Sequence, residues 1–217
     1  LYLLSDNEHL DASSKQYTLL AQEELTRITH IVRQTLGFYR EASHPVTVQI
    51  SDVVKSVLEL YKRKIENKRI SVTTDFTRES SIVAFPGEMR QVFSNLIANA
   101  LDALPSGGKI DIRVRKAHNP GDAHVPGVLC RISDNGQGIR RHNLRFIFEP
   151  FFTTKGEKGT GLGLWVTHGI VKKHLGWIRV RSSAEPERHG TTFLIFLPGK
   201  SQTLESGTQE HSRQISA

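Results

Sequence analysis

The chain has 217 residues, of which 37% are hydrophobic and 24% are charged, and its formal net charge is +7. These proportions are typical of a folded globular protein and exclude a chain that is disordered throughout. The single cysteine, Cys130, excludes a disulfide framework and a cysteine-rich zinc site, and it suits a reducing cytosol. No apolar run reaches the length of about 18 residues that a membrane-spanning helix needs.

The first predicted element is a long amphipathic helix over residues 15–41. Its apolar positions recur at spacings of three and four residues, the period of one helix face. They include Leu25, Ile28, Val32, Thr35 and Tyr39. The apolar stripe is wide, which is typical of a helix with partners on more than one side, as in a four-helix bundle. Pro45 ends the pattern because proline restricts the residue before it.

From Val46 onward the sequence predicts short strands alternating with helices. The first expected elements are a strand at 46–50, a helix at 51–67 capped by Ser51 and Asp52, and strands at 70–76 and 81–85. A helix from 86 that stops before 105–108 follows, and then a strand at 109–116, a surface loop at 118–127 and a strand at 128–133. The last part has irregular chain at 139–158, a helix at 160–174, and strands at 177–182 and 191–197. This order predicts an α+β domain over residues 46–198, with a mixed sheet and helices on one face. Met89, Trp165 and Trp177 are expected in its core. After it, residues 199–217 lack an apolar period and are expected to form a flexible tail.

Two asparagines, Asn95 and Asn99, stand four residues apart in the otherwise apolar helix that begins at 86, so they share one face. Buried amides need hydrogen-bond partners, and a purely local role is therefore the less favoured interpretation. A carboxamide oxygen is a hard ligand that suits Mg²⁺, which takes its other ligands from water and phosphates. The pair indicates a polar face that is compatible with a metal ion.

Asp134 follows an apolar strand and precedes Gly136 and Gly138. A carboxylate at a strand end in an apolar pocket can accept a hydrogen bond from the exocyclic amine of adenine. Glycines let the backbone come close to the base. An Asp-Asn-Gly turn between two strands is a common structural alternative, and this segment alone does not exclude it.

Gly159, Gly161 and Gly163 lie where the predicted helix at 160–174 begins. Backbone amides at a helix N-terminus attract anions, and the absent side chains let phosphates approach. The triplet does not follow a strand directly, which argues against a dinucleotide-binding unit. Neither Lys-Ser nor Lys-Thr follows it, which excludes a P-loop.

The segment before these glycines, residues 148–158, has the composition of a mobile lid. Phe148, Phe151 and Phe152 can anchor it, and Gly156 and Gly159 can act as hinges. Its candidate phosphate donors are Thr153, Thr154, Lys155 and Lys158. A solvated basic loop explains the individual lysines and threonines about equally well. Lys155 is the best candidate for a contact with a terminal phosphate.

The four segments, in this order and spacing, resemble the N, G1, F and G2 boxes of the histidine kinases. They are Asn95-Leu-Ile-Ala-Asn99-Ala-Leu-Asp102, Asp134-Asn-Gly136-Gln-Gly138, Phe148-Glu-Pro-Phe-Phe-Thr-Thr-Lys155 and Gly159-Thr-Gly161-Leu-Gly163-Leu. Histidine kinases belong to a wider ATPase group with gyrase, the Hsp90 chaperones and MutL, and the similarity covers residues 15–198. It implies a two-layer α/β sandwich of the Bergerat type that binds ATP and Mg²⁺. It also implies a preceding helical hairpin that forms a homodimer.

The resemblance implies a role for each matching residue: Asn99 is the Mg²⁺ ligand, and Asn95 supports the phosphate side. The implied ATP-binding residues are Asn95, Asn99, Asp102, Asp134, Gly136, Gly138, Thr154, Lys155, Gly159, Thr160, Gly161, Leu162, Gly163 and Thr192. Hydrolytic relatives place a glutamate where Asn95 stands, and an amide cannot accept a proton at neutral pH. The site is therefore expected to hold ATP for transfer to another group.

None of the ten histidines has the setting of a phosphoacceptor, which is typically followed by an acidic residue and a short proline-containing stretch. His30 lies in the segment that resembles the second helix of the hairpin. We therefore expect residues 1–45 to be part of a dimerisation hairpin whose acceptor histidine lies upstream of Leu1. The chain would then be a cytoplasmic portion of a longer sensor kinase, unable to phosphorylate itself.

The leading hypothesis for function is a histidine kinase core whose phosphate passes to the receiver domain of a response regulator. The alternatives are a serine-type kinase of the same fold and a nucleotide-binding dimerisation module without turnover. The positive net charge invites a nucleic-acid partner. However, the basic residues are scattered, and a nucleotide triphosphate explains a modest excess equally well, so no nucleic acid is expected.

Overall fold

The computed structural model describes residues 11, 13–21, 44–77, 79–119, 121–156 and 159–199, and the chain divides into two units, Leu1–Arg40 and Glu41–Ala217. In the first unit residues 13–21 are helical and expose Tyr17, Leu19 and Leu20. This helix covers the start of the one predicted at 15–41. The remainder of that prediction, and the tail predicted after Gly199, lie outside the described residues. No described helix is long and apolar enough to cross a membrane.

The second unit is built on a five-stranded mixed sheet in the order β2-β4-β5-β7-β6. Its strands are β2 (Ser71–Phe76), β4 (Lys109–Asn119), β5 (Asp122–Asp134), β6 (Trp177–Glu185) and β7 (Arg188–Pro198). β2 and β4 are parallel, and the other neighbours are antiparallel. A small second sheet pairs β1 (Val46–Gln49) with β3 (Ser81–Ala84).

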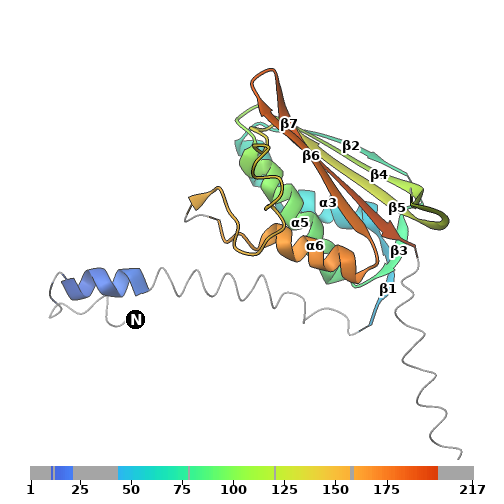
Figure 1. Ribbon diagram of the computed structural model, residues 1–217, viewed down its shortest axis with the longest axis horizontal. Helices are drawn as coiled ribbons and strands as arrows, with labels where there is room; N and C mark the ends of the chain where they lie inside the picture. Colours follow the sequence, from blue (N-terminus) through green and yellow to red (C-terminus); the bar gives the residue numbers. More distant parts are fainter. Residues whose placement is uncertain are drawn as a thin grey trace, which may run out of the picture. The chain divides into compact units, whose positions relative to one another are not determined.

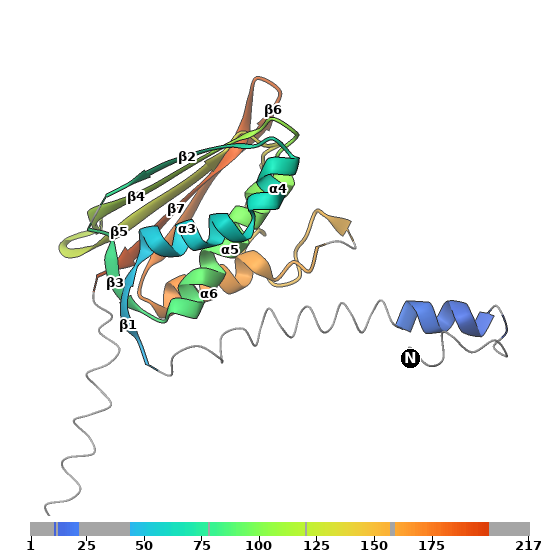
Figure 2. The same ribbon diagram turned by 180° about the vertical axis from the view of Figure 1, so that it is seen from behind.

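The described helices of the second unit form a second layer along one face of the five-stranded sheet, and none of these helices lies on its other face (Figures 1 and 2). They are α3 (Ile50–Leu60), α4 (Lys62–Asn67), α5 (Pro86–Ala103) and α6 (Gly163–Lys173). The predicted α+β class, with a mixed sheet and helices on one face, is confirmed.

The helix predicted at 51–67 is divided in two at Tyr61, and its predicted cap is wrong. Tyr61 leaves the helical conformation between α3 and α4 (φ −94°, ψ 5°), and its hydroxyl lies 3.0 Å from Ser94 Oγ on α5. The cap position is Gln49, one residue before α3, and no side chain caps the helix there. Ser51 lies inside α3, where its hydroxyl bonds that of Ser80.

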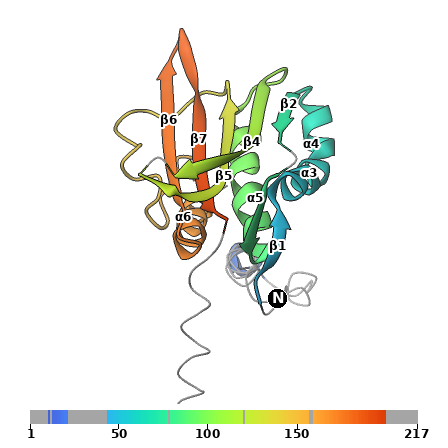
Figure 3. The ribbon, with the colours of Figure 1, turned by 90° about the vertical axis from the view of Figure 1, so that its right-hand side faces the viewer.

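The surface loop predicted at 118–127 is instead the end of a long hairpin, because β4 continues to Asn119 and β5 begins at Asp122. Pro126 is tolerated in β5 since it needs only to accept, and its carbonyl accepts from the Gly199 amide at 2.9 Å. The hairpin end bends toward β6 (Figure 3), where Trp177 Nε1 donates to Asn119 Oδ1 at 3.1 Å.

The core lies between α5 and the inner face of the sheet. The apolar side of α5 is fully or nearly fully buried at Met89, Val92, Phe93, Leu96, Ile97, Ala100 and Leu101, as its spacing predicts. Facing it, Ile110, Ile112 and Val114 of β4 are at most 1% exposed. Burial of each large apolar side chain contributes about 1.5–3 kcal/mol. Trp165 is 44% exposed on α6, so its expected place in the core is wrong.

Candidate functional site

Asn95 ties α5 to the beginning of α6. The side chain is 9% exposed, and its Nδ2 donates to Gly163 O at 2.9 Å and to Thr167 Oγ1 at 3.3 Å. Its Oδ1 accepts from Gln91 Nε2 at 3.1 Å. Both ends of the amide are therefore engaged, as a buried carboxamide requires. The contact places the first turn of α6 beside the polar face of α5.

One turn further along α5, Asn99 and Asp102 meet the lysine of the predicted lid. Lys155 Nζ donates to Asn99 Oδ1 at 2.9 Å and to Asp102 Oδ2 at 2.7 Å. Lys64 Nζ binds the other carboxylate oxygen of Asp102 at 2.5 Å. Burial alone would raise the pKa of Asp102, but the hydrogen bonds from the two lysines outweigh it and lower the pKa. The side-chain oxygens of Asn99 and Asp102 thus already bind the ammonium groups of two lysines.

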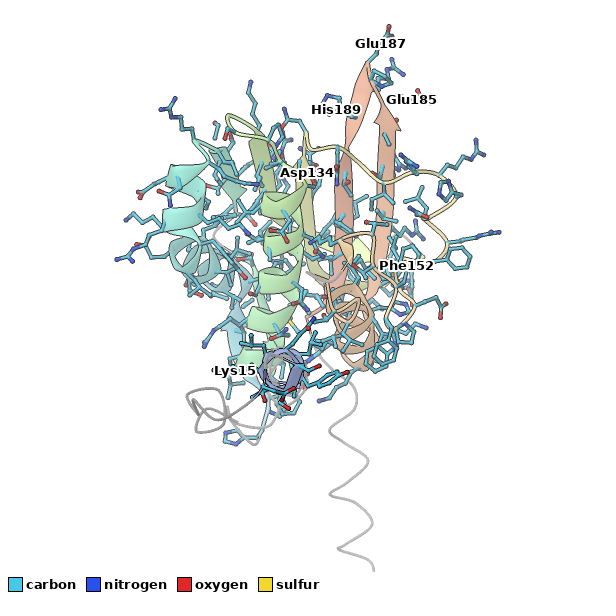
Figure 4. All side chains as sticks on the ribbon, turned by 90° about the vertical axis from the view of Figure 1, so that its left-hand side faces the viewer. Lys15, Asp134, Phe152, Glu185, Glu187 and His189 are labelled. Carbon is cyan, nitrogen blue, oxygen red and sulfur yellow. The ribbon has the colours of Figure 1, made fainter. Side chains whose placement is uncertain are left out.

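Asp134 ends β5 beside the C-terminal end of α5, where the Gln137 amide donates to Ala103 O at 3.1 Å. Its Oδ1 accepts from the Gly136 amide at 2.9 Å. Burial raises the pKa of Asp134, although hydrogen bonds from the Gly136 and Thr191 backbone partly oppose the shift. Figure 4 shows Asp134 beside α5 and close to His189, whose Nδ1 lies 2.9 Å from Gly136 O. The carboxylate is thus partly desolvated at the edge where the strands end.

The register of β5 and β7 separates Thr192 from Asp134. Thr192 pairs with Ser133, and their hydroxyls lie 3.0 Å apart on the sheet face away from the helices. Thr191 pairs with Asp134 and shares its face; it is 5% exposed. Sequence reasoning missed Thr191. The alternation from the buried Phe193 would have indicated it, because residues two apart on a strand share a face.

Gly138 and Gly161 occupy positions that no other residue fits easily. Both have positive φ, +70° and +68°. A Cβ at Gly138 would lie 1.7 Å from Ser183 O, and one at Gly161 would lie 2.3 Å from the Phe151 carbonyl carbon. Close backbone packing combined with left-handed φ requires glycine. These glycines fix the loop after β5 and the junction between the lid segment and α6.

The lid segment is anchored by two of its three phenylalanines. Phe148 stacks on His168 of α6 with ring centroids 5.1 Å apart, and Phe152 packs against Phe146 at 5.7 Å. Phe151 is 71% exposed and anchors nothing by its ring. Residues 139–156 form turns without a regular helix or strand, as predicted.

The remaining candidates lie around the start of α6. Leu162 is buried, Thr154 is exposed, and Thr160 Oγ1 accepts from the Leu162 amide at 3.4 Å. No side chain caps α6, so the amides of its first turn keep their capacity to bind an anion. A Cβ at Gly159 would clash with Thr153 Oγ1 at 2.1 Å. These residues share one neighbourhood with Lys155, Asn95 and Asn99.

The donor set around Asn99 limits how a metal ion could bind. Within the described ranges, no group of three or more His, Cys, Asp or Glu side chains could enclose one. Amide and carboxylate oxygens from one helix leave most of the coordination sphere to water and a ligand. That arrangement suits Mg²⁺ carried by phosphates and does not suit a structural metal site.

Residues 86–201 match the family model described as histidine kinase-, DNA gyrase B- and HSP90-like ATPase, which is more than half of the chain. The chain belongs to this ATPase family. The match contains the motifs at Asn95, Asp134 and Gly161. The predicted resemblance to the histidine kinases and their wider ATPase group is therefore confirmed.

Relatives of this chain include sensor kinases. It is 36% identical over 207 residues to the sensor kinase CckA of Brucella abortus (strain 2308); the match covers 90% of this chain and 22% of CckA. Among solved structures, the catalytic domain of histidine kinase ThkA is 25% identical with a TM-score of 0.63, covering 73% of this chain and 98% of that domain. ThkA in complex with response regulator protein TrrA matches at 25% identity and a TM-score of 0.63, covering 91% of this chain and 55% of ThkA. The match thus spans about a fifth of CckA but nearly all of the ThkA catalytic domain.

Proposed function

We propose that the chain is the ATP-binding and catalytic part of a two-component sensor histidine kinase. In this proposal it binds Mg-ATP and transfers the γ-phosphate to a histidine, and the phosphate then passes from that histidine to a response regulator. The observation that carries the proposal is that three of the sequence motifs lie in contact. The segment 95–102 is hydrogen-bonded to the glycine-rich segment 159–164 through Asn95 and Gly163, and to the lid segment through Asn99 and Lys155. Residues up to 68 positions apart in sequence thereby form one polar neighbourhood.

Asp134 would recognise adenine. Its partly desolvated carboxylate accepts from the exocyclic amine of ATP, where GTP presents a carbonyl oxygen. The nearby glycine Gly138 and the hydroxyl of Thr191 complete a surface that a planar base can approach. Recognition through the charged acceptor requires Asp134 to be ionised.

Asn99 would bind Mg²⁺, and Lys155 would bind the γ-phosphate. The Lys155 ammonium now contacts the Asn99 oxygen that the proposal assigns to the cation. Binding of Mg-ATP therefore requires Lys155 to leave Asn99 and Asp102 and to follow the phosphate. The lid segment that carries Lys155 moves with it, since Gly156 beside it has positive φ and open space.

Asn95 supports transfer over hydrolysis. Its amide has no proton-accepting nitrogen or carboxylate, and both of its ends are already hydrogen-bonded. A water near the γ-phosphate would find no general base at this position. The bound nucleotide is then kept for an incoming histidine.

The wider assembly follows from the same proposal. Residues 1–45 belong to a dimerisation hairpin, and the domain works in the cytoplasm as a homodimer. The acceptor histidine comes from a hairpin segment, because none of the histidines in this chain has an acceptor setting. The partner is the receiver domain of a response regulator; the histidine kinase ThkA likewise forms a complex with the response regulator protein TrrA.

Phosphate transfer to an added hairpin peptide tests the proposal. Incubation with γ-labelled Mg-ATP should leave the chain unlabelled and label the peptide in an acid-labile form, and Asn99→Ala should abolish the labelling. Nucleotide binding measured by calorimetry without transfer would support a passive module. Acid-stable label would support a serine-type kinase, and absence of any heat with ATP and Mg²⁺ would refute nucleotide binding itself.

A further inference from the structure

The face of the five-stranded sheet that the helices leave open carries a basic surface, which we call the arginine face. Strand pairing places Arg113 opposite Arg131, and it places both Arg131 and Arg179 opposite Leu194. Residues on the same side of a strand alternate, so Arg115 and Arg181 share this face. The arginine face therefore consists of Arg113, Arg115, Arg131, Arg179 and Arg181.

The arginine face lies across the sheet from the nucleotide site. The intervening residues Ile112, Ile132 and Phe193 are buried on the inner side, against the helices. The helix α5, which carries Asn99, lies on that inner side (Figures 1 and 2), so these arginines cannot reach a ligand bound at Asn99. ATP binding therefore does not account for the positive charge of these five arginines, and the proposed kinase function leaves them without a role.

Two aspartates only partly neutralise the arginine face. Asp111 Oδ1 accepts from Arg113 Nε at 3.1 Å and from Arg131 Nη2 at 2.5 Å, and Asp75 pairs with Arg115 at 2.5 Å. Arg131 Nε is buried and has no hydrogen-bond partner among the described residues.

The two arginines of β6 have no carboxylate partner in the described part of the chain. Arg179 lies over the Trp177 ring at 4.7 Å, and Arg181 is exposed. Guanidinium groups without a carboxylate partner keep donors for a ligand.

We propose that the arginine face docks an acidic polypeptide surface. Planar guanidinium groups bind carboxylates bidentately. Leu129, Leu194 and Trp177 lie among the arginines, and aromatic residues and arginine are enriched at the centres of protein interfaces. A nucleic acid or an anionic membrane surface fits less well, because the partly exposed Leu129 and Leu194 interrupt the arginines and offer apolar contacts that a row of phosphates does not use.

A fluorescein-labelled oligo-glutamate peptide tests the proposal by fluorescence anisotropy with the full chain. The double variant Arg179→Gln/Arg181→Gln should weaken binding at least tenfold. The matched double variant Arg140→Gln/Arg141→Gln, which removes the same charge from exposed positions elsewhere, should leave it within twofold. ATP affinity should not change in either variant. Asp111→Asn should tighten peptide binding, which a misfolded variant would not do.

Three outcomes would overturn the proposal. The first is that the wild-type chain binds no peptide in low salt. The second is that both double variants weaken binding equally. The third is that duplex DNA or phosphatidylserine vesicles displace the peptide and bind more tightly. The first outcome would mean that the arginine face binds no acidic peptide, and the second that binding depends only on net charge. The third would assign the arginine face to phosphate-bearing partners. None of them bears on ATP binding, so failure here is separate from failure of the kinase proposal.

Discussion

Asp134 combines a cost in stability with the role in adenine recognition that the nucleotide proposal assigns to it. Burial raises its pKa above the ordinary value of 3.8, so the fold favours the neutral form. A group of this kind stabilises the fold at low pH, and that contribution is lost as pH rises through the raised pKa. At neutral pH the ionised carboxylate therefore destabilises the fold. In the nucleotide proposal Asp134 is present because it binds adenine.

Asp134→Asn should reduce ATP affinity at least tenfold without lowering stability at pH 7. A hydrogen bond to a charged group contributes about 1.5–3 kcal/mol, and the amide replaces it with a weaker acceptor. Calorimetric titration gives the affinity and thermal unfolding gives the stability. A variant that binds ATP normally but melts at a lower temperature would show that Asp134 serves the fold alone.

At the scale of elements, an ionic cluster around the buried Glu88 joins the first turn of α5 to the last turn of α6. Glu88 is 5% exposed; its carboxylate binds Lys173 Nζ at 2.5 Å and lies 2.8 Å from Nε2 of the buried His174. Burial alone would raise the pKa of Glu88, but the bonds from His174 and Lys173 outweigh it and lower the pKa. The cluster holds the two helices that carry the nucleotide motifs.

Glu88→Gln should lower the free energy of unfolding by an amount on the order of 2 kcal/mol at pH 7. The lowered pKa means that this stabilisation is present above the ordinary value of 4.5 and is lost as pH falls through the folded-state pKa. Urea unfolding from pH 7 to pH 3 should show the two proteins converging in acid. Asp52→Asn breaks an exposed pair with Lys55 and should cost less than about 1 kcal/mol at any pH. A constant difference between wild type and Glu88→Gln would contradict the ionic origin.

Gly161→Ala tests the junction between the lid segment and α6. It should destabilise the fold by more than the roughly 1 kcal/mol expected from positive φ alone, because the added Cβ meets the Phe151 backbone. Gly156→Ala is the control, since Gly156 also has positive φ but nothing within 4 Å of an added Cβ. The difference between the two variants in urea unfolding isolates the clash. Equal losses would mean that the backbone around Phe151 adjusts.

For the whole molecule, Mg-ATP should stabilise the second unit as a ligand of the folded state only. At a concentration of 100 Kd the gain is about 2.7 kcal/mol, which raises the melting temperature by about 5–10 °C. Asn99→Ala should lose the part of this shift that depends on Mg²⁺. Arg179→Gln/Arg181→Gln should keep the full shift, because the sheet separates these residues from Asn99. Loss of the shift in the arginine variant would show that the two faces are coupled.

Local sequence patterns predicted most of the architecture, and tertiary contacts account for the errors. α5 was predictable because its apolar spacing and Pro86 agree. The break at Tyr61 was not, because its partner Ser94 is 33 residues away. The sequence predicts a loop at 118–127 because this segment is rich in Gly and Pro, but its composition does not reveal the contact between Asn119 and Trp177 that extends the hairpin. The site motifs were recognisable, but the pairing of Lys155 with Asn99 depends on how the lid segment lies against α5.

The two tryptophans provide separate optical reporters on the two sides of the sheet. Trp165 is on α6, the helix that carries the candidate phosphate site, and Trp177 lies beneath Arg179 on the arginine face. Proteins retaining a single indole, made by Trp165→Phe or Trp177→Phe, would let emission from one side be recorded without the other. Nucleotide should quench or shift the emission of Trp165 and an acidic peptide that of Trp177, so each occupancy can be followed in its own single-tryptophan variant without any attached dye.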